Sequence, residues 1–145
     1  MDDVTVLEAL AAHVRTKTPP AGRVVKKVFA FPVESISGAL PAVVLYSGSD
    51  SVEYGASNRR TTLSVKLALY LPLVEYAAQY EILNTWRAWV RDLLIDGVTL
   101  NSTSGVSQAS VTSTDINSTE YADAPVIEVS ANVEIVGVEA ISTSA

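Results

Sequence analysis

Residues 61–72 of this 145-residue chain read Thr-Thr-Leu-Ser-Val-Lys-Leu-Ala-Leu-Tyr-Leu-Pro. Apolar side chains occupy every second position through most of the stretch: Leu63, Val65, Leu67, Leu69 and Leu71. A period of two is typical of a β-strand, because successive side chains point to opposite faces of a sheet. The stretch therefore predicts a strand with one buried face, and Pro72 ends it because proline cannot donate to the strand ladder.

The pattern changes to a helical period directly after this strand. From Val74 onward, apolar residues recur at spacings of three and four: Tyr76, Tyr80, Leu83, Trp86, Val90 and Leu94, flanked by Ile82, Trp89 and Leu93. This spacing predicts a long amphipathic helix that packs on the sheet and ends in a turn at Asp96-Gly97. Trp86 and Trp89 lie about 300 degrees apart around such a helix. We therefore expect at least one of the two in the core, with Trp86 as the position to test, while the other is available to a neighbouring subunit.

Local patterns predict the remaining elements. Asp2 or Asp3 is expected to cap a helix that runs from Val4 to Arg15 with its apolar positions on one side. The predicted strands are Arg23–Phe31, Ala42–Tyr46, Val106–Thr114 and Val126–Val138. In the last strand the apolar phase slips around Gly137, which predicts a β-bulge or the strand leaving the sheet. Together these elements indicate one sheet-on-helix domain, residues 1–141, and a frayed tail, residues 142–145.

Composition and charge narrow the class of protein. The chain is 48% hydrophobic and carries 10 lysines and arginines against 16 acidic residues, a formal net charge of -6. Diffuse negative charge repels phosphates, so sequence-specific binding of nucleic acid is disfavoured. The cations gather only weakly, at Lys26, Lys27, Arg59 and Arg60. With no cysteine, disulfides and thiolate sites are excluded. No signal peptide or membrane-spanning apolar run is visible, so we expect an intracellular protein.

No residue pattern in the chain indicates catalysis. His13, the only histidine, is a candidate general base, yet without a neighbouring nucleophile a surface or helix-end histidine is the favoured interpretation. A serine-nucleophile elbow and a glycine-rich phosphate loop are both missing from the sequence. One cluster is rich in side-chain oxygen, but its spacing does not fit a calcium loop and favours a solvated loop: Asp115, Asn117, Glu120 and Asp123. We therefore expect no enzymatic activity, no metal and no cofactor.

The segment from Ser47 to Asn58 is polar, contains two glycines and has no hydrophobic period. It is longer than a usual connection of about four to six residues, which indicates either a long connection or an extended hairpin arm. Without apolar residues to hold it in a monomer core, the segment is expected to work between subunits. The candidate interface residues are the charged Asp50, Glu53, Arg59 and Arg60, with Val52 and Tyr54 as a small apolar anchor. For the two arginines, pairing with acidic groups of a partner and simple solvation are equally open.

The order of these elements resembles that of the tail-terminator, or tail-completion, proteins of long-tailed bacteriophages. The resemblance rests on the helix Val4–Arg15, the strand Pro41-Ala-Val-Val-Leu-Tyr46, the polar arm, the strand Arg59-Arg-Thr-Thr-Leu-Ser-Val-Lys-Leu-Ala-Leu-Tyr-Leu-Pro72, the helix through Trp86-Arg-Ala-Trp-Val-Arg91 and a β-rich C-terminal third. It covers nearly the whole chain as a pattern, without a diagnostic motif. The resemblance implies an α+β fold with a mixed, mainly antiparallel sheet and two helices packed on one face.

The same resemblance implies a structural virion protein without catalytic residues. Such a protein forms a homo-oligomeric ring, a homohexamer, that ends growth of the tail tube and joins the tail to the head at the neck. The implied partners are the tail-tube protein and a head-tail connector or adaptor protein. DNA would pass through without sequence-specific binding, and no membrane would be contacted. The protein would be assembled in the cytoplasm of the host bacterium and reside in the virion.

Two alternatives stay open at the level of sequence. The first is another phage neck component, such as a head-completion or adaptor protein, which would share the ring and the lack of chemistry. The second comes from a different class, a small monomeric hydrolase or ligand-binding module. The size of the assembly discriminates between a ring subunit and a monomer.

Overall fold

Two helices and five strands make up the part of the chain that the computed structural model describes, namely residues 2–36, 38–73, 80–95, 99–100, 103 and 105–140. In chain order they are α1 (Asp3–Thr16), β1 (Lys27–Phe29), β2 (Ala42–Tyr54), β3 (Asn58–Pro72), α2 (Tyr80–Arg91), β4 (Gln108–Tyr121) and β5 (Ala124–Ala140). The strands form one sheet in the order β1-β2-β3-β5-β4. β1 runs parallel to β2, and the other pairings are antiparallel. The expected tail, residues 142–145, lies outside the described residues.

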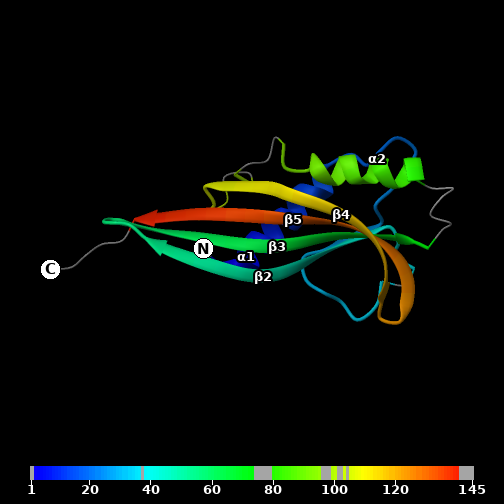
Figure 1. Ribbon diagram of the computed structural model, residues 1–145, viewed down its shortest axis with the longest axis horizontal. Helices are drawn as coiled ribbons and strands as arrows, with labels where there is room; N and C mark the ends of the chain where they lie inside the picture. Colours follow the sequence, from blue (N-terminus) through cyan, green and yellow to red (C-terminus); the bar gives the residue numbers. More distant parts are fainter. Residues whose placement is uncertain are drawn as a thin grey trace.

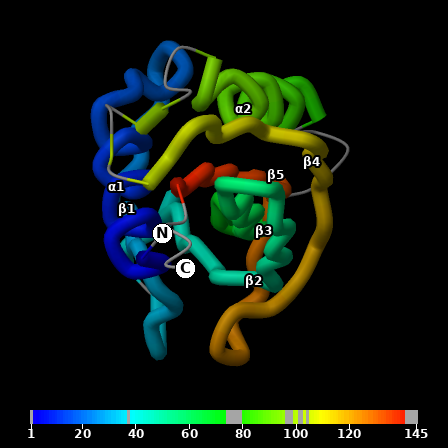
Figure 2. Tube along the Cα trace, turned by 90° about the vertical axis from the view of Figure 1, so that its left-hand side faces the viewer, coloured from blue at the N-terminus to red at the C-terminus, as the bar shows by residue number. Residues whose placement is uncertain are grey.

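Both helices lie on the same face of the sheet, which we call the helix face (Figure 1). α1 packs beside β1 and β2, whereas α2 packs beside β4 and β5. Seen along the long axis, the sheet curls: β4 starts near α1, crosses beneath α2 and continues down the side of the molecule away from α1 and β1 (Figure 2). The fold is therefore α+β, with a mixed, mainly antiparallel sheet and two helices on one face. This confirms the fold class expected from the sequence.

α1 begins at the predicted cap. The carboxylate of Asp2 accepts hydrogen bonds from the Val4 amide at 3.1 Å and from the Thr5 hydroxyl at 2.9 Å, which stabilises the first turn. The buried stripe of the helix comprises Val6, Leu7, Leu10, Ala11 and Val14. The helix predicted over Val4–Arg15 is confirmed, and it is one residue longer at each end.

α2 covers less of the chain than the apolar stripe predicts. Residues 74–79 and the expected turn at Asp96-Gly97 lie outside the described residues. Helical structure ends at Arg91, and the chain continues in turns that bury Leu93 and Leu94. Among the described residues, neither helix combines the length and the apolar character needed to cross a membrane.

The two tryptophans of α2 occupy different environments. Trp86 is only 2% exposed, so its expected position in the core is confirmed. Trp89 packs with its ring edge-on to Trp86, at a centroid distance of 5.6 Å, and its indole N–H donates to the Thr18 carbonyl at 2.9 Å. Trp89 therefore anchors the segment that follows α1 onto α2, a contact within the chain.

β3 and β5 are central strands and supply the middle of the core. Their odd-numbered residues, from Leu63 on β3 and from Ile127 on β5, pair across the two strands and point to the helix face. The even-numbered side chains point to the opposite face, which we call the far face. Ala68 and Tyr70 on the far face are also buried, against Phe29, Val33, Ile36 and Leu40. The expectation of a single buried face for this strand is therefore wrong in its C-terminal half.

Strand lengths depart from those predicted by the sequence. Within the predicted strand Arg23–Phe31, only Lys27–Phe29 is paired. β2, β3, β4 and β5 all run past at least one predicted end. The bulge or departure from the sheet expected at Gly137 is wrong, because Gly137 pairs in register opposite Thr61 and the ladder continues beyond it.

A bulge in β2 reverses the direction of its side chains. The register with β3 shifts between Ser47 and Asp50, where β2 holds one residue more than its partner. Gly48 permits the close approach of the two strands, because a Cβ there would lie 2.7 Å from the Ser64 carbonyl oxygen. Before the bulge the odd-numbered residues of β2 point to the helix face, and after it the even-numbered ones do.

A second bulge lies on β4, between Val111 and Ser113. It has the same effect on side-chain direction and places the later odd-numbered residues on the far face. Tyr121 therefore meets Tyr70 there, with ring centroids 5.1 Å apart in an edge-to-face arrangement. The two bulges thus determine which side chains of β2 and β4 point to the helix face and which point to the far face.

Candidate subunit interface

The polar segment 47–58 folds as an extended hairpin, and we call it the arm. It comprises the end of β2, the turn and the first residue of β3. β2 continues to Tyr54, and the Gly55 amide donates to the Asn58 carbonyl at 2.8 Å to close the turn. β5 extends alongside, with Ala140 paired opposite Asn58. The hairpin tip and the end of β5 project together at one end of the long axis, beyond both helices (Figure 1). Of the two interpretations left open by the sequence, the hairpin arm is the correct one.

The β2 bulge sorts the six candidate interface residues onto two faces. Directly paired residues share a face, and Asp50 is paired with Leu63, which lies in the helix-face core. The helix face of the arm region therefore carries Asp50, Val52, Tyr54 and Arg59. The far face carries Glu53 and its register partner Arg60. The structure thus divides the predicted interface into a side with the aromatic anchor and a purely charged side.

Arg59 has a partner within its own chain. Its Nη2 lies 2.7 Å from Glu139 Oε2, and the two residues are register partners on β3 and β5. The hydrogen bond that the guanidinium donates to Glu139 raises the pKa of Arg59 above its usual value. Both side chains are more than a third exposed, so solvent screens the pair, which fixes the geometry of the arm more than it stabilises the fold. Arg60, in contrast, is exposed.

Three apolar side chains of this region are exposed to solvent. Tyr54 is 71% exposed, Val138 48% and Val52 44%. Val138 lies opposite Arg60 on the far face, and it is missing from the interface residues singled out by the sequence. The slip in apolar phase from Ile135 to Val138 is the signal that identifies it. A side chain at the end of so narrow an extension cannot reach the core, so all three remain available to a partner.

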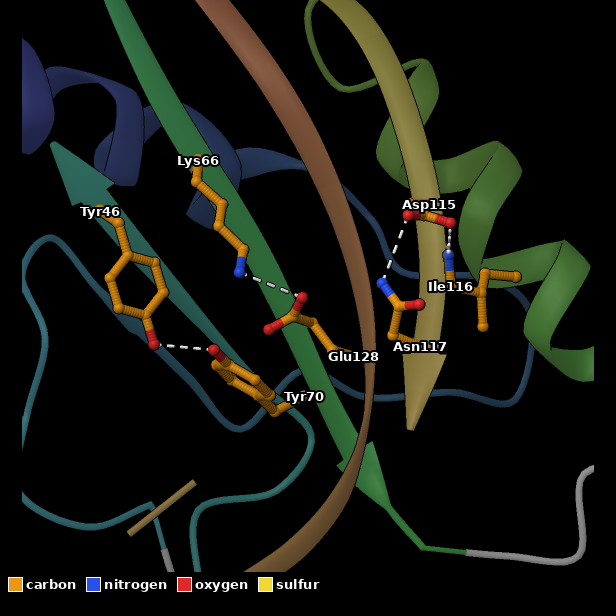
Figure 3. A network of polar contacts seen from close by, with 7 residues as sticks. All are labelled: Tyr46, Lys66, Tyr70, Asp115, Ile116, Asn117 and Glu128. Carbon is orange, nitrogen blue, oxygen red and sulfur yellow. Dashed lines mark hydrogen bonds and ion pairs between the residues drawn. The ribbon is translucent and has the colours of Figure 1, made fainter. Parts of the chain in front are cut away.

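A polar network on the far face escapes sequence reasoning altogether. The phenolic oxygens of Tyr46 and Tyr70 lie 2.7 Å apart, and Lys66 Nζ lies 3.1 Å from Glu128 Oε1 (Figure 3). Burial raises the pKa of both phenols, which stay neutral and hydrogen-bonded at neutral pH. The Tyr121 hydroxyl bonds to the backbone of Val33. The network ties the segment before β2 to the sheet. Its signal in the sequence is Tyr70, a large aromatic residue that alternates with the leucines of the buried face.

His13 lies in the last turn of α1, so the expected helix-end position is confirmed, but the side chain is buried and not on the surface. It is 5% exposed, and its Nε2–H donates to the Leu93 carbonyl at 2.8 Å. This hydrogen bond joins α1 to the turn that follows α2. His13 therefore acts as a packing residue between two elements.

The oxygen-rich cluster lies mostly on a strand, so the solvated loop expected for it is wrong. Asp115, Asn117 and Glu120 belong to β4, and Asp123 lies in the turn that follows. Asp115 accepts hydrogen bonds from the Ile116 amide at 2.9 Å and from Asn117 Nδ2 at 3.3 Å (Figure 3). In the described part of the chain, no group of three or more histidines and acidic residues is arranged to hold a metal ion.

No protein-family model matches this chain, and no curated protein matches it either. The surfaces of the protein are therefore the guide to its function. Their main feature is the arm, an ordered β extension whose side chains are exposed on both faces.

Proposed function

We propose that this protein is a structural virion component that forms a homo-oligomeric ring, a hexamer, which ends tail-tube growth and joins the tail to the head. The arm is the single observation that carries the proposal. It projects beyond both helices and exposes Val52 and Tyr54. β5 runs beside it as far as Ala140, which pairs with Asn58, and exposes Val138 in the same region. An ordered extension of this kind, with no core of its own to cover, is suited to contact another protein chain.

A ring follows from the nature of such a contact. In this proposal the contact is heterologous: the arm of one copy binds a different surface of its neighbour. An arm-to-arm contact, in contrast, would stop at a dimer. Repeated head-to-tail contacts of this kind either close into a ring or grow into a filament. A ring on the end of the tail tube requires closure, and the tail-tube protein and a connector or adaptor protein would then bind its two faces.

The negative net charge of the chain suits a ring through which DNA passes. With 16 acidic residues against 10 lysines and arginines, the protein as a whole repels phosphates. DNA would therefore pass without sequence-specific binding, and any association with duplex would weaken steeply with salt. A sub-micromolar, sequence-dependent affinity at about 0.15 M salt would contradict this part of the proposal.

The arm itself provides the test. Replacing Ser49–Ala56 by a short Gly/Ser linker removes the tip and leaves β3 paired with β5. We expect unchanged far-UV circular dichroism and a folded monomer, because every residue removed is exposed. Ring formation and capping of tail tubes, both visible by negative-stain microscopy, should fail. An arm-deleted protein that still assembles and caps tubes would move the interface away from the arm.

A further inference from the structure

Charge is distributed very unevenly along the chain. Residues 9–33 contain five lysines and arginines and no acidic residue, whereas the residues after Arg91 contain eight acidic residues and no lysine or arginine. The stretch between them is balanced, with five residues of each sign. The net charge of -6 therefore conceals a positive region and a strongly negative one.

The fold places these two regions at opposite edges of the sheet. Residues 9–33 form most of α1, the connection after it and β1, which is one edge strand. The residues after Arg91 form β5 and β4, and β4 is the other edge strand. Figure 2 shows β4 starting near α1, crossing beneath α2 and then running down the side of the molecule away from α1 and β1. The later part of β4 contains Asp115 and Glu120. The protein is therefore polarised from edge to edge.

The positive edge is hollowed into a groove of about 440 Å³ between the end of α1 and β1. Its lining includes four cationic side chains, Arg15, Lys17, Lys26 and Lys27, and two aromatic ones, Phe29 and Trp89. Arg15 is held in place by donating to the Val28 carbonyl at 2.7 Å. No acidic residue lines the groove, and within the described residues neither Lys26 nor Lys27 belongs to an ion pair. We call this feature the basic groove.

The negative edge presents carboxylates on an unpaired strand. β4 pairs with β5 on one side, and in the described part of the chain its other side has no strand partner. Asp115, Glu120 and Asp123 are all exposed along β4 and its turn. We call this feature the acidic edge, and the oxygen-rich cluster found in the sequence is part of it.

We propose that the basic groove of one copy binds the acidic edge of a second copy. This proposal rests on the ring proposed above and adds a second pair of contact surfaces to the contact made by the arm. The two surfaces are complementary in charge, occur on the same chain and lie at opposite edges, which is the arrangement that a head-to-tail ring needs. A groove lined by four cations and two aromatic rings fits a narrow acidic protein edge. Outside residues 9–33 the chain carries 16 acidic residues against five lysines and arginines, so duplex DNA would have to approach a molecule whose remaining net charge is negative.

A charge-reversal experiment tests the pairing. The groove-reversed variant carries Lys26→Glu and Lys27→Glu, and the edge-reversed variant carries Asp115→Lys and Glu120→Lys. All four side chains are exposed, so both variants should fold. Each variant alone sets like charges against each other at the interface, and we expect its assembly concentration to rise by about tenfold or more. A Lys26→Arg, Lys27→Arg control keeps the charge and should assemble as the wild type does.

Mixing the two variants gives the decisive result. The groove-reversed chain has an acidic groove and an acidic edge, and the edge-reversed chain has a basic groove and a basic edge. In an equimolar mixture, each contact between two different chains therefore joins opposite charges, whereas each contact between two identical chains joins like charges. We therefore expect assembly to return in the mixture, measured by analytical ultracentrifugation, with the two chains alternating. Normal assembly of either variant alone, or no recovery in the mixture, would overturn the proposal while leaving the ring intact. A groove-reversed variant that assembles normally but loses duplex binding would assign the groove to phosphates and overturn it. A wild-type protein that stays monomeric would overturn the ring as well.

Discussion

The hydroxyl groups of Tyr46 and Tyr70 form a hydrogen bond of 2.7 Å on the far face of the sheet, between β2 and β3. Tyr70 is 3% exposed, and its ring also meets the edge of Tyr121 on β4. Burial raises the pKa of Tyr70 and, to a smaller extent, of Tyr46. Two neutral phenols, one buried and one half-buried, therefore help to hold the segment before β2 against the sheet.

The first prediction concerns the stability of the fold at alkaline pH. Because the pKa of Tyr70 is higher in the folded than in the unfolded state, its contribution is fully present below pH 10 and is lost as the pH rises through the folded value. Stability should fall by at most about 1.4 kcal/mol per pH unit above about 10 from this residue. Tyr70→Phe should remove this part of the loss. Urea unfolding at pH 8 and pH 11 measures it, with the exposed Tyr54→Phe as the matched control. Equal alkaline losses in the wild type and in Tyr70→Phe would contradict the assignment.

The β2 bulge supplies a second prediction. Gly48→Ala places a Cβ 2.7 Å from the backbone carbonyl oxygen of Ser64, and backbone cannot move aside as a flexible side chain does. We expect a loss of about 1 to 3 kcal/mol in unfolding free energy. Ser49→Ala, at the neighbouring exposed position, should change it by less than about 0.5 kcal/mol. Chemical denaturation of the two variants decides the matter, and equal stability would mean that the strands do not approach closely at Gly48.

The two tryptophans give a third prediction. Trp86→Ala should destabilise the protein by about 3 to 5 kcal/mol, because a large buried side chain is replaced by a cavity. Trp89→Phe keeps the ring contact and loses the hydrogen bond to Thr18, so about 1 kcal/mol is expected. Urea midpoints of the two variants provide the measurement. A Trp86→Ala protein as stable as the wild type would show that this side chain is not in the core.

The fourth prediction separates the two faces of the arm. Val52→Ser with Tyr54→Ser removes the apolar anchor from the helix face, and both positions are largely exposed in the single chain. The melting temperature of the single chain should stay nearly unchanged. Assembly should weaken, because Val52 and Tyr54 would be buried only in the proposed ring. Glu53→Gln on the far face is the control and should assemble more nearly as the wild type does. The reverse order of effects would place the neighbouring subunit on the far face.

The elements that the sequence predicts well are those with strong periods and local caps. Asp2 marks the start of α1 and the alternation from Leu63 to Leu71 marks β3, because both signals depend only on nearby residues. The core position of Trp86 follows from the apolar stripe of α2. These features need no knowledge of what packs from elsewhere in the chain.

Features that depend on contacts between distant segments could not be predicted from local sequence patterns. The burial of Tyr70 depends on residues 29–40 crossing the far face, a contact between segments distant in sequence. The faces of Val52 and Tyr54 depend on the bulge near Gly48, because one extra residue reverses every side chain after it. The partner of Arg59 is Glu139, eighty residues later. The charged edges likewise appear only when the sheet order puts β1 and β4 at its two ends.

In the proposed assembly, the chain closes into a ring by head-to-tail contacts. Native mass spectrometry of the wild-type protein over a range of concentrations tests it most directly. We predict that, as concentration rises, monomer gives way to one assembly of fixed copy number, six, with no larger species in the series. A protein that remains monomeric at every concentration, or that gives an open-ended ladder of growing oligomers, would contradict the ring.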